Sequence, residues 1–283
     1  MSRKPTRTNL SVLAQLCNLI PAFLVSKIAR QSGVDKKART FSPWSHLVAL
    51  LFAQFTHALS LNDVCDALKN HAGKLLRIRD ASPPSKNALS HANRQRDGDM
   101  AQTLFWEILN HLTTMCPRFG GQTFKGMPRR FKRAVYAVDS STIRLVVNCI
   151  DWARHRRRKA AAKLHLASSI AELYKSRWEI EVFFKEIKQT LQLCDFLGHN
   201  KNAVLWQVWT ALILYVLLRF LAFANSWQHG FKRFFCLLRS SVWDGVLIAS
   251  LASLCGTARG APAMRAAPEQ LYLPGFGPRE ARG

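Results

Sequence analysis

The stretch YKSRWEIEVFFKEIKQTLQ, residues 174–192, decides how the fold and the chemistry of this chain are interpreted. Four of its polar side chains lie at offsets of 0, 3, 7 and 14 residues: Tyr174, Arg177, Glu181 and Lys188. On a helix these four, here named the polar column, fall within roughly 60° of one another. Such a column suits holding a phosphate backbone and a metal ion together. An ordinary amphipathic helix with a solvated charged face is the alternative.

The same stretch carries an apolar stripe beside the polar column. Its members recur at helical spacing: Ile180, Phe183, Phe184, Ile187 and Leu191. A stripe with this period is typical of a helix that packs one face against a core. We therefore predict a helix over residues 174–192, anchored by the stripe.

The charge of the chain indicates a polyanionic partner. Lys and Arg total 41 against 17 Asp and Glu, which gives a formal net charge of +24. A protein that binds nucleic acid gains from this excess because each neutralised phosphate releases counterions. Attraction to a membrane surface is the other standard explanation of basic character. The 48% of hydrophobic residues is enough for a folded core.

The most apolar segment is AVLWQVWTALILYVLLRFLAFA, residues 203–224. It is about long enough to span a bilayer, for which roughly 20 apolar residues suffice. However, Gln207, Thr210 and Arg219 interrupt it, and its two tryptophans do not lie at both ends. A buried core helix is therefore the preferred interpretation, and we predict no stable membrane association.

The cysteines and the first residues indicate a cytoplasmic protein. Seven cysteines are scattered without a CxxC pair, so neither a disulfide framework nor a zinc site is predicted. A reducing compartment fits best. The basic start MSRKPTRTNL lacks the apolar run that a signal peptide needs.

Cap signals predict that the first hundred residues are helical. Ser11 (or Asn9), Ser42 followed by Pro43, and Ser60 stand where helix N-caps are expected. Each is followed by apolar residues at helical spacing. These signals predict helices that begin close to residues 12, 43 and 61.

Two polar segments are candidates for direct contact with DNA. SKNALSHANRQRD, residues 85–97, could be the reading helix of a helix-turn-helix-like unit, with an ordinary solvated helix as the alternative. DWARHRRRKAAAKLHL, residues 151–166, is strongly basic. Four arginines of these segments are predicted to bind DNA: Arg94, Arg96, Arg156 and Arg157.

Residues 133–150 differ from the helical part because they are rich in Val, Ile and Tyr, which is typical of strands. Asp139 ends their first apolar run, and Ser140 and Ser141 follow as a predicted turn. A second, short strand is predicted from Lys163.

Together these features resemble a DDE transposase of the bacterial insertion-sequence-four type. That family has a helix motif spaced Tyr, two residues, Arg, three residues, Glu, six residues, Lys, and the polar column matches every interval. The flanking RW, IE and FFKEIKQ letters match too, as does the upstream AVDSSTIRL. The similarity extends to LSHANRQRD and to the PEQLYLPGFG tail.

The resemblance implies a ribonuclease-H-like catalytic domain, a mixed sheet flanked by helices. Asp139 would be the first metal-binding carboxylate and Glu181 the third, and both would be catalytic. They would hold Mg²⁺ or Mn²⁺, hard cations that carboxylates suit. The other three members of the polar column would bind the DNA. The implied partner is double-stranded DNA at the element ends, with a homodimer in the DNA complex left open.

The pattern breaks between the first and third carboxylates. The family carries a second Asp on another strand in this interval, but only 41 residues separate Asp139 from Glu181 here. None of the intervening carboxylates lies on a suitable strand: Asp151, Glu172 and Glu179. The join of Leu166 to Ala167 resembles an internal deletion. We therefore expect a transposase derivative whose catalysis is defective.

The predicted fold class is α+β and predominantly helical. A helical N-terminal domain with a DNA-binding role (1–78) and a helical connector (79–124) precede a truncated ribonuclease-H-like core (125–200). C-terminal helices and a tail (201–283) follow. Two other functions stay open. One is a DNA-binding remnant without catalysis, and the other is a basic membrane-associated protein built on residues 203–224.

Overall fold

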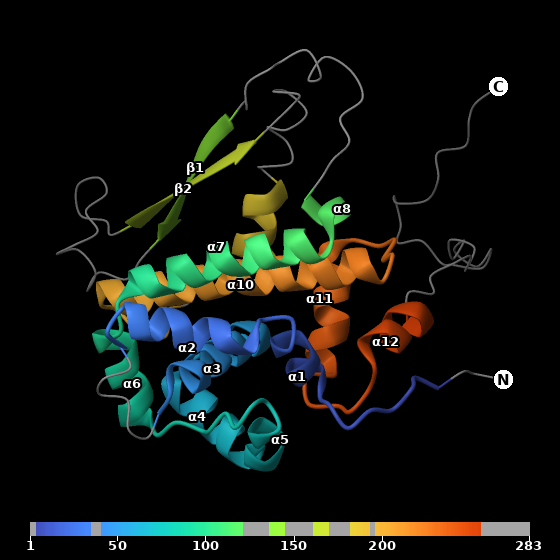
Figure 1. Cartoon of the computed structure of the whole chain (residues 1–283), viewed down its shortest axis with the longest axis horizontal. Helices are drawn as coiled ribbons and strands as arrows, with labels where there is room; N and C mark the ends of the chain where they lie inside the picture. Colours follow the sequence, from blue (N-terminus) through green and yellow to red (C-terminus); the bar gives the residue numbers. More distant parts are fainter. Residues whose placement is uncertain are drawn as a thin grey trace, which may run out of the picture.

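The computed structural model describes residues 4–34, 41–120, 136–144, 161–169, 182–192 and 196–255. In this part of the chain helices predominate, and two strands form one antiparallel pair (Figure 1). The helices before the strands are α1 (Val12–Cys17), α2 (Ala22–Gln31), α3 (Pro43–Thr56), α4 (Leu61–Asn70), α5 (Ala72–Leu76), α6 (Lys86–Gln95), α7 (Gly98–Met115) and α8 (Pro117–Gly120). After the strands come the π-helix η4 (Glu186–Thr190), α10 (Lys201–Ala224), α11 (Phe231–Ser240) and α12 (Ile248–Cys255).

The N-terminal helices begin where the cap signals predict. Ser11, Ser42 and Ser60 each have extended backbone, and each side chain accepts a hydrogen bond from a backbone N–H of the first helical turn. Pro43 occupies the first position of α3, where its missing N–H costs nothing. The three predicted helix starts are therefore confirmed.

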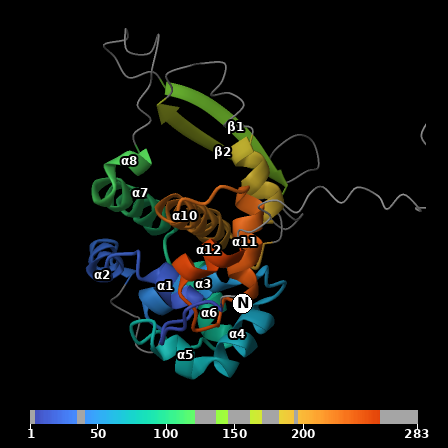
Figure 2. The same cartoon turned by 90° about the vertical axis from the view of Figure 1, so that its right-hand side faces the viewer.

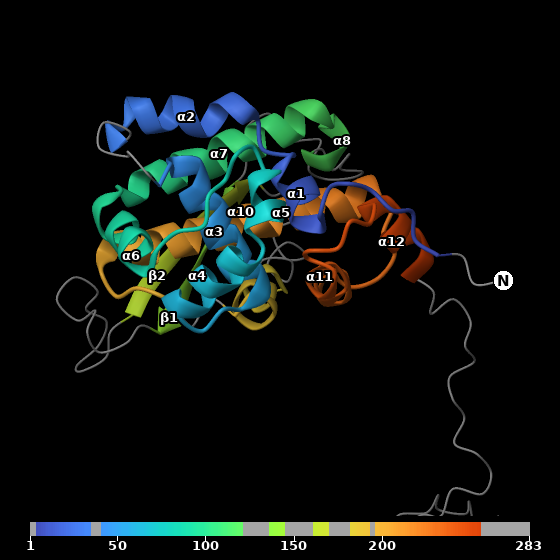
Figure 3. The same cartoon turned by 90° about the horizontal axis from the view of Figure 1, so that it is seen from below.

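Helices α7 and α10 lie side by side and run in the same direction (Figures 1 and 3). At their first turns the Gly98 amide donates to Asn202 Oδ1 at 3.3 Å. Near their far ends the ring of Phe119, in α8, packs against Phe220 and Phe223 of α10. Because α3, α6 and α11 also contact α10, this helix is the centre of the fold.

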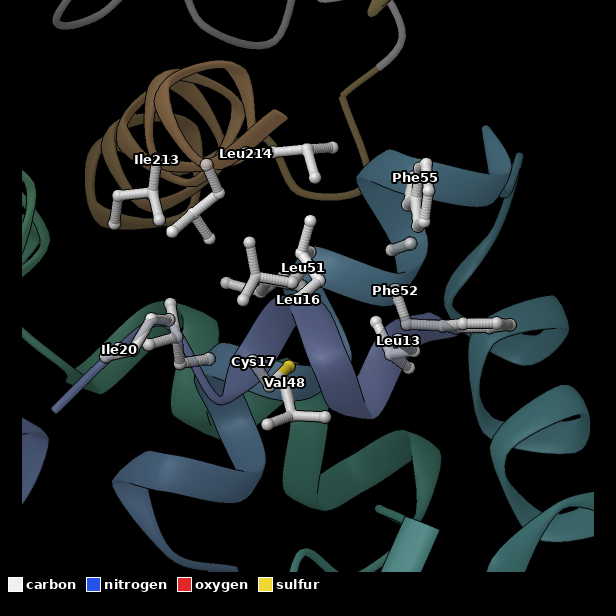
Figure 4. Packing of buried hydrophobic residues seen from close by; sticks show 14 of the residues in the cluster. Leu13, Leu16, Cys17, Ile20, Val48, Leu51, Phe52, Phe55, Ile213 and Leu214 are labelled. Atoms are coloured by element: carbon white, nitrogen blue, oxygen red, sulfur yellow. The ribbon is translucent and has the colours of Figure 1, made fainter. Parts of the chain in front are cut away.

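One apolar cluster extends from α1 to α12 through this centre. Figure 4 shows side chains of α1, α3 and α10 that point toward one another, among them Leu16, Leu51 and Leu214. Cys17 belongs to this cluster, and burial raises the pKa of its thiol to about 12 although Arg79 opposes the shift. Cys17 is therefore a core residue and not a nucleophile.

Helix α10 is the described helix that is long and apolar enough to cross a membrane. In the structure 67% of its most apolar window is buried among other helices. Helices α3 and α4 pass the same criterion only as a pair bent by 105°. The core-helix prediction for residues 203–224 therefore agrees with the packing.

The two strands are β1 (Tyr136–Arg144) and β2 (Ala161–Ser169), and Asp139 pairs with Leu166. They lie outside the helical body, on the side where η4 is found (Figure 2). The predicted turn at Ser140 and Ser141 is wrong, because both residues pair with β2 inside a continuous strand. Strand β2 also continues through Leu166 and Ala167, where the deletion was inferred.

Close contact between α7 and α10 leads to a stability prediction at Gly98. A Cβ added there would lie 2.6 Å from Cβ of Leu205, so the two helices would have to separate. We expect Gly98→Ala to lower the free energy of unfolding by about 1–3 kcal/mol, measured by urea denaturation.

Gly73 in α5 is the matched control, because a Cβ added there meets no atom within 4 Å. Gly73→Ala is expected to be neutral or to stabilise the protein by up to about 1 kcal/mol, through helix propensity alone. Equal midpoints for the two variants would contradict the proposed close approach of α7 and α10.

Candidate functional site

The described part of the stretch that carries the polar column is residues 182–192. Its apolar stripe is buried at Phe184, Ile187 and Leu191, and Phe183 is half-buried. Lys188 is exposed. Figure 2 shows this segment beside α10 and α11, and both helices contact η4. The stripe thus anchors the segment and leaves Lys188 at the surface.

The helix in this segment departs from α geometry. Residues 182–185 form an α-helical turn, and the next residues form the π-helix η4. The Leu191 amide donates to the Glu186 carbonyl, five residues earlier, at 3.1 Å. Gln192 then adopts a left-handed backbone with φ of 50°, so the helix ends two residues before the predicted boundary. Single π turns inside helices occur frequently at functional sites.

Three polar side chains join this segment to α10. Glu186 Oε2 accepts hydrogen bonds from the Tyr215 hydroxyl at 2.9 Å and from Arg219 Nη2 at 2.5 Å. Arg219 Nε also donates to the Tyr215 oxygen at 2.9 Å. We call these residues the Glu186 cluster. Sequence reasoning missed it, since Arg219 was noted only as an interruption of an apolar segment.

Burial and charge act in opposite directions in the Glu186 cluster. Burial raises the pKa of the Tyr215 hydroxyl, so the phenol stays protonated and donates. Burial lowers the pKa of Arg219, but Tyr215 and Glu186 outweigh it and the net pKa is raised. Arg219 therefore remains a cation beside the carboxylate.

The remaining members of the predicted site are described only in part. The structure places Asp139 within β1, at the fourth residue of the strand rather than at its end. Five predicted site residues lie outside the described residues: Tyr174, Arg177, Glu181, Arg156 and Arg157. The convergence of Asp139 with the polar column therefore stays a prediction.

Helix α6 divides the residues predicted to read DNA into two sets. Its exposed face carries Lys86, Ser90, His91 and Arg94. Asn93 faces the other way and is buried, which identifies a packed helix rather than one solvated on all sides. The exposed face is free of the core and contains one of the four predicted arginines.

The structure corrects the role expected of Arg96. Its side chain is only 7% exposed, and its guanidinium donates to the carbonyls of Phe41 and of Ser42, the latter at 3.3 Å. The guanidinium also lies 5.5 Å from the Phe41 ring centroid. Arg96 therefore joins α6 to the start of α3 and does not present its charge to DNA. Because buried arginines are rare, the spacing of residues in the sequence does not predict that Arg96 is buried.

Arg79 is a second arginine that acts inside the fold. Its Nη2 donates to the carbonyls of Cys17 and Ile20, at 3.0 and 2.7 Å. Its guanidinium stacks over Trp44 at 4.7 Å from the ring centroid. The number of basic residues in the sequence is therefore larger than the number whose charge is available to a partner at the surface.

A buried polar network lies next to Arg96. His46 Nε2 is 2.8 Å from Asn93 Oδ1, and its ring packs 4.6 Å from that of Trp206. The Trp206 indole in turn donates to the Arg96 carbonyl at 3.2 Å. Burial lowers the pKa of His46 to about 3, and the Arg96 charge acts in the same direction. The network fixes α6 against α3 and α10.

Comparison with known families assigns two parts of the chain. Residues 130–217 match the transposase DDE domain, a range that contains Asp139 and the whole polar column. The chain is similar to DDE-type insertion-sequence transposases. Residues 8–78 match a domain of unknown function, DUF4372. This second match covers α1 to α5, and it does not indicate what those helices do.

Three proteins named as candidate transposases share parts of the sequence. The protein y4zB of Sinorhizobium fredii is 34% identical over 53% of this chain and 38% of its own length. A Geobacillus stearothermophilus protein, named for insertion sequence element IS5377, is 47% identical over 19% of this chain and 15% of its own. A Synechocystis protein, named for element IS4SA, is 33% identical over 31% and 24%.

The chain thus spans well under half the length of these transposase relatives. A comparison with solved structures gave no significant match. Within the described residues, no three His, Cys, Asp or Glu side chains are grouped so that they could hold a metal ion. Asp139 lies among the described residues and Glu181 does not, so their shared metal site stays a prediction.

Proposed function

We propose that this chain derives from a DDE transposase of the insertion-sequence-four type and binds double-stranded DNA at the ends of its element. The match of residues 130–217 to the transposase DDE domain carries this proposal. The net charge of +24 supports it. Of the three predicted DNA contacts that the structure describes, Lys188 and Arg94 are exposed and Arg96 is buried.

The proposed transposase derivative is defective in strand cleavage and transfer. Only 41 residues separate Asp139 from Glu181, and we infer that an internal deletion removed the second catalytic Asp with part of a ribonuclease-H-like core. Mg²⁺ or Mn²⁺ would bind weakly to two carboxylates, since hard cations need several oxygen ligands. The alternative within this proposal is a DNA-binding remnant that never acts on DNA.

The protein is proposed to work in the cytoplasm without a stable membrane association. The burial of α10 between other helices supports this, because a spanning helix would expose its apolar surface to lipid. The scattered free cysteines suit a reducing compartment.

Salt dependence tests the DNA-binding function. The full chain, purified without detergent, is titrated with duplex DNA from the flanks of its gene and with an unrelated duplex. If six to ten phosphates are contacted, affinity should fall by about 10³–10⁵ between roughly 50 and 200 mM NaCl. The stoichiometry of the complex tests the homodimer expectation. The same complexes, incubated with Mg²⁺ or Mn²⁺, should show no cleavage or end joining.

Two results would contradict the proposal in different ways. Binding that does not change with salt, or a chain that needs detergent at every salt concentration, would remove the DNA-binding function. Robust metal-dependent cleavage would leave the transposase assignment intact but remove the inferred defect.

A further inference from the structure

We propose that the Glu186 cluster (Glu186, Tyr215 and Arg219) positions the π-helix η4 so that Lys188 faces the DNA backbone. These three residues are positioning residues: they act through Lys188 and do not themselves contact the ligand. The inference rests on the proposed function, since it specifies how the same site holds a phosphate.

The geometry of the cluster is a closed triangle between two helices. Glu186 is the first residue of η4, whereas Tyr215 and Arg219 lie one turn apart on α10. Each of the three side chains is hydrogen bonded to the other two, at 2.5–2.9 Å. Two helix-to-helix bonds converge on one carboxylate oxygen, so rotation of η4 about its axis would break both.

Aromatic rings surround this triangle and tie it to a third helix. The Arg219 guanidinium lies 4.9 Å from the ring centroid of Phe231, the first residue of α11. The ring of Phe183, one turn before Glu186, meets Tyr215 edge-on with centroids 5.0 Å apart. The Glu186 side chain is 16% exposed, so solvent screens its charge only partly.

A second hydrogen bond holds the other end of η4. The amide of the buried Gln54 in α3 donates to the Leu191 carbonyl. Lys188 lies between Glu186 and Leu191 and is exposed. A five-residue π turn has little stability of its own. The direction in which Lys188 leaves the surface therefore depends on these two attachments together with the buried apolar stripe.

A gain in folding stability does not by itself explain the Glu186 cluster. The Arg219 side chain is 39% exposed, and an ion pair that is partly open to water gains little net free energy, because solvent screens the attraction between the charges. Its geometric requirement, in contrast, fixes one orientation of the helix. This separates the positioning role from a general contribution to folding.

The sign of a DNA-binding change provides the test. Glu186→Gln removes a negative charge, which by long-range electrostatics alone should strengthen binding to a polyanion. Positioning requires the opposite, so we expect affinity for duplex DNA to fall about threefold to tenfold, with a salt slope smaller by about one phosphate. Glu107→Gln on the exposed face of α7 removes the same charge away from η4 and is expected to leave binding unchanged or slightly tighter.

Coupling to Lys188 distinguishes positioning from local damage. Lys188→Ala should weaken binding, and adding Glu186→Gln to it should cause no further loss, because the residue through which Glu186 acts is gone. Tyr215→Phe keeps the ring, removes two bonds of the triangle but leaves the one between Arg219 and Glu186, and should show a smaller effect of the same sign. Hydrogen exchange of the Leu191 amide, followed without DNA, should be at least tenfold faster in Glu186→Gln.

Several outcomes would overturn the inference. They are tighter binding by Glu186→Gln, an effect of Glu186→Gln that adds fully to Lys188→Ala, or unchanged exchange at Leu191. Any of these can occur while the unaltered chain still binds DNA with the expected salt dependence. Loss of that salt dependence in the unaltered chain would instead reject the proposed function, and the inference with it.

Discussion

Between about pH 6.5 and pH 4, the folded protein is expected to lose roughly 3 kcal/mol of stability through one imidazole, that of His46. His46 is fully buried, and its pKa is lowered from 6.5 to about 3, first by burial and then by the Arg96 charge. Asn93 Oδ1 can only accept, so Nε2 of His46 carries the proton. A second proton would have to enter at Nδ1, which has no hydrogen-bond partner among the described residues.

The direction of this effect follows from the two pKa values. Above pH 6.5 His46 is neutral in both the folded and the unfolded chain, so its contribution is constant. Below pH 6.5 the unfolded chain binds a proton and the folded chain does not, which favours unfolding by about 1.4 kcal/mol per pH unit. Below about pH 3 the folded protein binds the proton as well, and the loss levels off.

Urea denaturation at several pH values measures this loss. His46→Gln keeps a polar group but cannot titrate, so its free energy of unfolding should fall less steeply between pH 6.5 and 4. Other acid-titrating groups, including His71 with its lowered pKa, are common to both proteins and cancel in the difference. Parallel pH curves for the two proteins would show that His46 already accepts a proton when folded.

Local signals predicted the starts of the helices because each signal acts within one turn. A serine that accepts from the amide three residues later needs no tertiary partner, so Ser11, Ser42 and Ser60 could be assigned from the sequence. Residues 136–144 form β1, so the predicted turn at Ser140 and Ser141 is wrong. Serine favours turns locally, and pairing with β2 overrides that preference.

The candidate site was predictable only as far as helical periodicity reaches. The buried face of residues 182–192 follows from the apolar stripe, and so does the exposure of Lys188. The π-helix η4 does not, because a five-residue element leaves no repeat in the sequence. Nor does the partner of Glu186, since Arg219 is 33 residues away and meets it only through tertiary packing.

The roles of the arginines could not be predicted from the sequence either. An arginine that binds backbone carbonyls inside the protein cannot be told in the sequence from one that binds phosphate. Arg94 and Arg96 are two residues apart in one segment, and both were predicted to contact DNA. Arg94 lies in the last turn of α6, whereas Arg96 follows the helix as its C-cap and has extended backbone. Arg94 is exposed at the surface, whereas Arg96 is buried beside the start of α3.

This pair of arginines leads to the second large prediction. Arg96→Ala is expected to lower the free energy of unfolding by about 2–4 kcal/mol, because the carbonyls of Phe41 and Ser42 lose a charged donor inside the protein. Arg94→Ala should change stability by no more than about 0.5 kcal/mol, since its side chain is exposed. Urea denaturation at neutral pH measures both values.

The effects on DNA binding should be the reverse of those on stability: the change at Arg94 should weaken binding more than the change at Arg96. Arg94→Ala is expected to weaken binding to duplex DNA and to reduce the salt slope by about one phosphate. Arg96→Lys restores a positive charge but not the planar fork that reaches two carbonyls, so it should remain destabilised. At a temperature where it is still folded, its salt slope should equal that of the unaltered chain. A reduced slope for Arg96→Lys with full stability would show that Arg96 contacts the DNA in the unaltered chain, and would contradict its role in joining α6 to α3.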